Sequence, residues 1–104
     1  MKIQNRVIIL PSSIVRDFNI SNGAFRCLCI LIMYMNLERG WNVTQRRIAN
    51  LMNVSRRAVN NYLRDLEDAE LIDVERKPHS KSKYFLSQAL IETILDPMLD
   101  LEEL

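Results

Sequence analysis

A chain of 104 residues, 48% of them hydrophobic, is long enough to bury one core but not two, so a single domain over residues 1–104 is expected. The formal net charge of +1 gives no overall basic or acidic signature, and any affinity for nucleic acid must come from local clusters. The apolar run over residues 27–35 is far shorter than the roughly 20 residues that a membrane-spanning helix needs, and no small-residue cleavage site marks a signal peptide.

The first 20 residues are expected to form a strand and a short helix. Residues 2–10 are strand-like, with an apolar run at residues 7–10. Pro11, followed by Ser12 and Ser13, is typical of a helix start, and the helix should run to about residue 17.

A longer helix is predicted over residues 23–39, capped by Ser21 or Asn22 and stopped by Gly40. Apolar side chains cover nearly its whole circumference, which is typical of a helix buried on all sides. The helices that follow can cover one side. The N-terminal segment or a partner subunit must cover the other.

The two cysteines of this helix favour no covalent or metal role. Cys27 and Cys29 lie two positions apart, so their side chains project to nearly opposite sides and suit neither a mutual disulfide nor a metal clamp. Reduced thiols, a cytoplasmic location and no cofactor are the expectation.

Residues 44–69 predict two short helices joined by a tight turn. Thr44 caps a helix over residues 45–52, and Ser55 caps a second helix that extends to about residue 69. Asn53 tolerates the left-handed conformation that a three-residue turn requires. Both helices have an apolar face, made by Ile48, Leu51, Met52, Val59, Tyr62, Leu63 and Leu66. This pattern is typical of a helix-turn-helix, and it indicates that the protein binds DNA.

Two strands and a last helix complete the chain. Residues 71–76 and 83–87 read as a hairpin around a basic tip at residues 77–82, and residues 41–43 offer a third strand for the same sheet. Ser87 caps a final helix over residues 88–95, and Pro97 interrupts or restarts it. Residues 88–104 therefore form a helical extension with an apolar face, which we interpret as a possible dimerisation segment.

Charge alternates in blocks along this half of the chain. Residues 44–64 contain five arginines and no acid, and residues 65–75 contain six acids and no base. Residues 76–83 contain four basic side chains and no acid, and residues 84–104 contain five acids and no base. A helix that is basic at its start and acidic at its end can direct its first turns at phosphates while its last turn stays away. The alternative is a set of solvated faces.

The candidate site residues come from three segments. On the second helix, Arg57, Asn61 and Arg64 point away from the core, while Asn60 flanks them and Arg56 lies at the N-terminal end. Arginine suits guanine and asparagine suits adenine in the major groove. The start of the preceding helix and the hairpin tip suit phosphates. The predicted DNA contacts are Thr44, Gln45, Arg46, Ser55, Arg56, Arg57, Asn60, Asn61, Arg64, Lys77, His79, Lys81 and Lys83.

Two stretches resemble known families. Residues 21–87 resemble the winged helix-turn-helix pattern, most closely in the stretch VTQRRIANLMNVSRRAVNNYLRDLEDAELIDVERK. Asn53 stands where such motifs usually carry glycine. IILPSSIVRDFNISNGAFRCLCILIMYMN is similar to the N-terminal domain of plasmid and phage replication initiators and to phage-type regulators. The resemblance implies a mainly α fold with a small β-wing that binds double-stranded DNA.

The function that these features favour is transcriptional regulation of a phage or other mobile element by a homodimer. One alternative is the DNA-binding domain of a replication initiator, and another is a winged helix that binds protein. An enzyme is not expected, because the sequence offers no glycine-rich phosphate loop, no nucleophile paired with histidine and no metal-ligand spacing. The acids at residues 65–73 read as the solvated end of a helix, and no small-molecule ligand or membrane contact is indicated.

Overall fold

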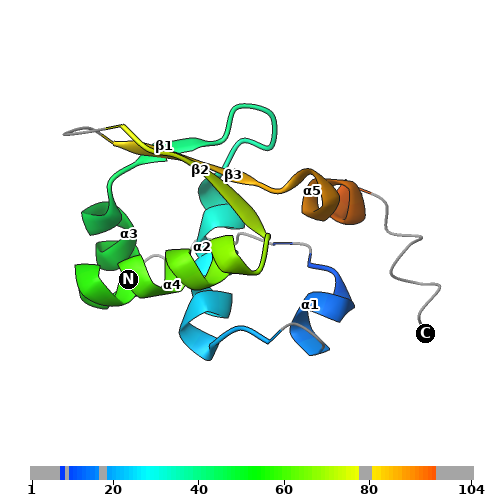
Figure 1. Ribbon diagram of the computed structural model, residues 1–104, viewed down its shortest axis with the longest axis horizontal. Coiled ribbons are helices and arrows are strands. Elements are labelled where there is room, and N and C mark those ends of the chain that lie inside the picture. Colours follow the sequence, from blue (N-terminus) through cyan, green and yellow to red (C-terminus); the bar gives the residue numbers. More distant parts are fainter. Residues whose placement is uncertain (1–7, 9, 17–18, 78–80, 96–104) are drawn as a thin grey trace, which may run out of the picture.

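The computed structural model describes residues 8, 10–16, 19–77 and 81–95, which form a helical domain with one small sheet (Figure 1). The sheet lies along one side of the helices. Helix α3 and the hairpin lie toward one end of the molecule, and α1 and α5 lie toward the opposite end. The elements are α1 (Ser12–Arg16), α2 (Asn22–Tyr34), β1 (Trp41–Val43), α3 (Gln45–Met52), α4 (Arg56–Asp68), β2 (Ile72–Glu75), β3 (Ser82–Leu86) and α5 (Gln88–Leu95).

The sheet has three antiparallel strands in the order β1-β3-β2. Tyr84 of β3 pairs with Trp41 on one side and with Val74 on the other, which confirms the predicted third strand. Side chains alternate along β3, so that Tyr84 and Leu86 are buried against the helices while Lys83 and Phe85 lie on the other face.

The core forms around α2. Leu28 and Leu31 of this helix are fully buried together with residues of α3 and α4, and no polar or charged side chain is buried among the described residues. At Gly23 a Cβ atom would collide with the ring of Tyr62, so glycine lets α4 lie close to the first turn of α2. Of the described helices, none has the length and apolar character to cross a bilayer.

Helix α2 ends at Tyr34, so the prediction that it continues to residue 39 was wrong. Met35 adopts an extended conformation, and the Asn36 side chain accepts hydrogen bonds from the backbone N–H groups of Glu38 and Arg39, both at 2.9 Å. Gly40 closes the turn with φ +73°. Asparagine offers the backbone an alternative to helical hydrogen bonds, and here that local competition ends the helix.

Burial of α2 is also less complete than expected. Ala24, Cys27, Leu28 and Leu31 are buried, whereas the other apolar side chains of the helix are only half-buried. Burial raises the pKa of the Cys27 thiol to about 12 and raises that of Cys29 as well, so both are neutral thiols at neutral pH.

Helices α1 and α5, near the two ends of the described chain, line one shared hollow. Ile14 of α1 is buried in the core, and the Ser87 backbone N–H donates to the Leu71 carbonyl at 2.9 Å. Ser87 caps α5 as predicted, accepting from the backbone N–H of Leu90. The expected strand at residues 2–10 lies mostly outside the described residues, and its described positions 8 and 10 are not in a strand. Pro97 and the rest of the predicted extension also lie outside them.

Candidate nucleic-acid interface

The turn between α3 and α4 has the geometry that the sequence predicts. Thr44 accepts a hydrogen bond from the Arg47 backbone N–H at 3.1 Å, and Ser55 accepts one from Ala58 at 3.0 Å. Asn53 ends α3 in the left-handed conformation, with φ 58° and ψ 47°. These caps fix the first turn of each helix, and both hydroxyls can still donate their own protons to an acceptor.

Helix α4 divides cleanly into a packed and an exposed face. Val59, Leu63 and Leu66 are buried, whereas the four side chains predicted to face DNA, Arg56, Arg57, Asn61 and Arg64, are exposed. The helix begins at Arg56 and carries no acidic residue before Asp65. Its N-terminal dipole and its arginines therefore favour an anion at the same end.

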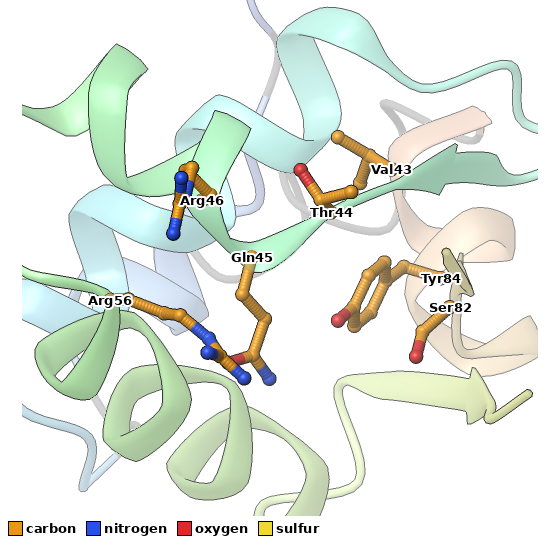
Figure 2. Close-up of a pocket in the computed structure, with 7 residues that line it drawn as sticks. All are labelled: Val43, Thr44, Gln45, Arg46, Arg56, Ser82 and Tyr84. Atoms are coloured by element: carbon orange, nitrogen blue, oxygen red, sulfur yellow. The ribbon is translucent and has the colours of Figure 1, made fainter. Parts of the chain in front are cut away.

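Three adjoining hollows are lined by side chains of α3, of α4 and of the hairpin strands β2 and β3. Their volumes are about 380, 370 and 120 Å³. We call their combined lining the basic groove. Arginines come from α3, from α4 and from the residue after β2, and no acid is among the lining residues. Figure 2 shows Gln45, Arg56 and Tyr84 directed into the largest hollow from three different elements. The lining residues are Val43, Thr44, Gln45, Arg46, Arg56, Arg57, Asn60, Leu63, Arg64, Val74, Arg76, Ser82 and Tyr84.

Two acids near the end of α4 make specific contacts, one of them with Arg76 of the groove lining. Asp65 accepts a hydrogen bond from the backbone N–H of Ser21 at 3.1 Å, which ties α4 to the start of α2. Glu67 accepts two hydrogen bonds from Arg76, at 2.7 and 3.1 Å. These bonds hold the pKa of the Glu67 carboxyl below its ordinary value. These bonds are solvent-exposed, so the acidic stretch is accessible to solvent as predicted, but Asp65 and Glu67 also bind specific partners.

Only some of the predicted site residues line the basic groove. Thr44, Gln45, Arg46, Arg56, Arg57, Asn60 and Arg64 line the basic groove. Ser55, the N-cap of α4, and Asn61 on α4 are exposed but do not line it. Lys77 and Lys81 are exposed in the segment between β2 and β3. His79 lies outside the described residues.

Lys83, also a predicted contact, does not line the basic groove. Strand alternation places it on the face of β3 opposite Tyr84, and its Nζ lies 5.5 Å from the centre of the Phe85 ring. It therefore points away from the groove that Tyr84 and Ser82 line.

Sequence reasoning missed three lining residues that carry polar groups: Arg76, Ser82 and Tyr84. The signal for Tyr84 was present, because alternation along β3 buries it and a buried tyrosine hydroxyl needs a polar neighbour. Within the described part of the chain, no three His, Cys, Asp or Glu side chains gather in a way that could hold a metal ion.

Comparison with known proteins supports this description. The model of a family described as a helix-turn-helix domain matches residues 19–72, just over half of the chain. Among solved structures, ZitR of Lactococcus lactis, a zinc-responsive MarR family member, is similar at 22% identity and a TM-score of 0.57, over 95% of this chain and 65% of ZitR. A mutant of MepR from a multidrug-resistant clinical isolate of Staphylococcus aureus has 22% identity and a TM-score of 0.60, over 86% and 62% of the two chains.

The MepR–DNA complex is a third similar structure, with 23% identity and a TM-score of 0.57 over 88% of this chain and 77% of MepR. The chain thus spans less than two thirds of the ZitR and mutant MepR chains. No curated protein matches it in sequence. At these identities the solved structures show the fold, which is a winged helix, and the matched segment contains the whole of α3, the turn and α4. The chain therefore belongs to the helix-turn-helix domain family.

Proposed function

We propose that this protein binds double-stranded DNA in a sequence-specific way and regulates transcription. The basic groove carries the proposal: five arginines from three segments surround it, of which Arg76 is paired with Glu67, and no acid lines it. In a chain with a formal net charge of +1, these arginines give one surface a local excess of positive charge. Local potential of this kind attracts a polyanion even when the net charge does not.

The exposed face of α4 is suited to the major groove. One helix fits that groove, and Arg57, Asn61 and Arg64 would face the base edges when the N-terminal half of α4 enters it. Thr44 and Arg46 at the start of α3 would then lie against a phosphate, where the helix dipole is favourable. Lys77 and Lys81 would reach the backbone from the hairpin.

Regulation is favoured over replication because of the similar structures. MepR is described as a transcription regulator of a multidrug efflux pump, and it has been solved in complex with DNA. We propose that this chain likewise binds DNA and regulates transcription. A role in a phage or other mobile element belongs to the same proposal, and it rests on the sequence resemblance alone.

Homodimerisation is a further part of the proposal. Val15 of α1 is 62% exposed and Leu95 of α5 is 66% exposed, and Ile91 and Ile94 are only half-buried beside Leu95. Helices α1 and α5 lie at the end of the molecule opposite α3 and the hairpin (Figure 1). A two-fold contact there would leave both basic grooves open to two half-sites about one helical turn apart.

Light scattering tests the dimer. We expect the full chain to be dimeric at tens of micromolar, a range typical of modest interfaces, and Leu95→Glu to be monomeric with an unchanged circular dichroism spectrum. A monomeric full chain would remove this part of the proposal.

Fluorescence anisotropy across a salt series tests DNA binding. The basic residues of the two blocks, residues 44–64 and 76–83, could neutralise about 4–6 phosphates per subunit, and log K should fall with log salt by about 0.9 per contact. The rival function, a winged helix that binds protein, predicts no duplex binding at low salt. That result would overturn the DNA-binding proposal.

A further inference from the structure

Gln45 occupies the centre of the basic groove. It is the first residue of α3, it is half-buried, and its side chain lines all three hollows. It is the only residue that the three linings share. A side chain in that place contacts both the α4 surface and the root of the hairpin.

The Gln45 amide makes a specific bond to α4. Its Nε2 donates to Oδ1 of Asn60 at 3.2 Å, across a separation of 15 residues in the sequence. Asn60 is half-buried, on the flank of the face that carries Arg57 and Asn61. With Oδ1 engaged, the Asn60 amide has one preferred orientation, which leaves its N–H groups available as donors.

Tyr84 approaches Gln45 from the sheet. Only 2% of this tyrosine is exposed, and its hydroxyl points into the largest hollow (Figure 2). Burial raises the pKa of Tyr84, while hydrogen bonding to the Ser82 and Gln45 side chains opposes that rise. The phenol is therefore neutral at neutral pH, and it contacts the same amide that holds Asn60.

We propose that Gln45 is a positioning residue that fixes the amide of Asn60 for base readout and links that orientation to the hairpin. This inference rests on the proposed DNA-binding function. A free asparagine amide can rotate to present either an acceptor or a donor, whereas a fixed one presents donors and discriminates between base edges. Gln45 itself need not touch a base.

A purely structural Gln45 makes a different prediction. If the bond only held α3 against α4, its loss would weaken binding to all sequences alike. If the bond orients Asn60, its loss must relax the preference at the base pair that Asn60 reads. Base preference is therefore the decisive readout, rather than affinity.

The test uses the full chain and a randomised duplex library, with the bound fragments sequenced. Gln45→Met keeps the length of the side chain and removes the amide, and we expect selectivity at one base pair to fall about five- to tenfold. Gln88→Met is the matched control. Gln88 is also the first residue of a helix, and its Nε2 donates a hydrogen bond to Oε1 of Glu92 at 3.3 Å. This bond lies on α5, outside the basic groove. Gln88→Met should leave the base preference unchanged at every position of the bound site.

Two more variants sharpen the test. In an Asn60→Ala background Gln45→Met should have no further effect on base preference, because the two residues act through one bond. Gln45→Glu can only accept from Asn60, so the Asn60 amide should turn over, present Oδ1 to the DNA and change the preferred base.

The outcomes separate this inference from the function on which it rests. A wild-type chain that selects no sequence overturns sequence-specific binding and this inference with it. A selective wild-type chain whose preference survives both Gln45→Met and Gln45→Glu overturns the positioning role alone. NMR of the free protein gives an independent reading, since Gln45→Met should shift the side-chain amide resonances of Asn60, and unchanged resonances would also contradict the inference.

Discussion

Two parts of α4, residues 56–64 and residues 65–68, use their charged side chains in opposite ways. Arg56, Arg57 and Arg64 in the first part are exposed and line the basic groove. Asp65 and Glu67 in the last turns bind other parts of the same chain, namely the start of α2 and Arg76 after β2. The three arginines thus face the groove, while two of the acids bind other parts of the domain.

This division explains how a nearly neutral chain can present a basic surface. Acids near the end of a helix interact unfavourably with its dipole, so their presence needs a reason beyond helix stability. Here the reason is tertiary, because one acid binds α2 and the other binds Arg76 at the base of the hairpin. Variants in the two parts should therefore change different measurements, with binding on one side and stability on the other.

The largest effect is expected at Arg57. Arg57→Ala should weaken binding to the preferred duplex by about 1–3 kcal/mol and relax base preference, since a side chain that reads a base edge is lost. Its melting temperature should stay unchanged, because Arg57 is exposed. Arg47→Ala is the matched control, an exposed arginine of α3 that lines none of the three hollows. Equal losses in both variants would contradict the assignment of α4 as the reading helix.

Asp65 should behave in the opposite way. Asp65→Ala removes the acceptor for the Ser21 backbone N–H, and we expect it to lower the free energy of unfolding by about 1 kcal/mol while DNA affinity changes little. Urea unfolding measures the loss. Asp68→Ala is the control, because it removes an exposed acid from the same helix end and should be neutral or slightly stabilising through the dipole. Equal destabilisation by the two variants would show that the Asp65 bond has no special weight.

The hairpin offers a smaller comparison between two lysines. Lys81→Ala should weaken binding to all sequences by roughly 0.5 kcal/mol and reduce the salt slope by about 1, as expected for one phosphate contact. Lys83→Ala should leave the salt slope unchanged, because Lys83 lies over Phe85 on the far face of the sheet. A reduced slope for Lys83→Ala would place that face against DNA as well.

Local signals predicted most of the fold. The caps Thr44 and Ser55 and the left-handed Asn53 depend on residues within a few positions of each other, and the bounds of α3 follow from them. The end of α2 was missed because the asparagine turn at Asn36 competes with a long apolar pattern that reads as helix. Hydrophobic periodicity carries no information about that competition.

The site was less predictable because its contacts are tertiary. Arg57 and Arg64 could be placed on the exposed face of α4 from the period of the helix alone. The bond between Gln45 and Asn60, and the place of Tyr84 beside them, depend on how α3, α4 and β3 meet. A strand period fixes which face Lys83 occupies, but the sequence does not say which face the groove is on.

The smallest effect concerns pH and the Glu67–Arg76 pair. Hydrogen bonding to Arg76 lowers the pKa of Glu67 below its ordinary value, so the pair stabilises the fold above that value and loses its effect as pH falls through the folded-state pKa. The side chains are 33% and 65% exposed, and water screens the pair to at most about 0.5 kcal/mol.

Glu67→Gln should therefore be slightly less stable than the wild type at pH 7, and the gap should close as the pH falls below about 4.5. Thermal unfolding at pH 7 and at acid pH measures both differences. A gap for Glu67→Gln that widens on acidification would contradict the ionised pair. It would also remove one of the two contacts that give the acidic end of α4 its structural role, leaving the Asp65 bond to carry the contrast between the two parts of the helix.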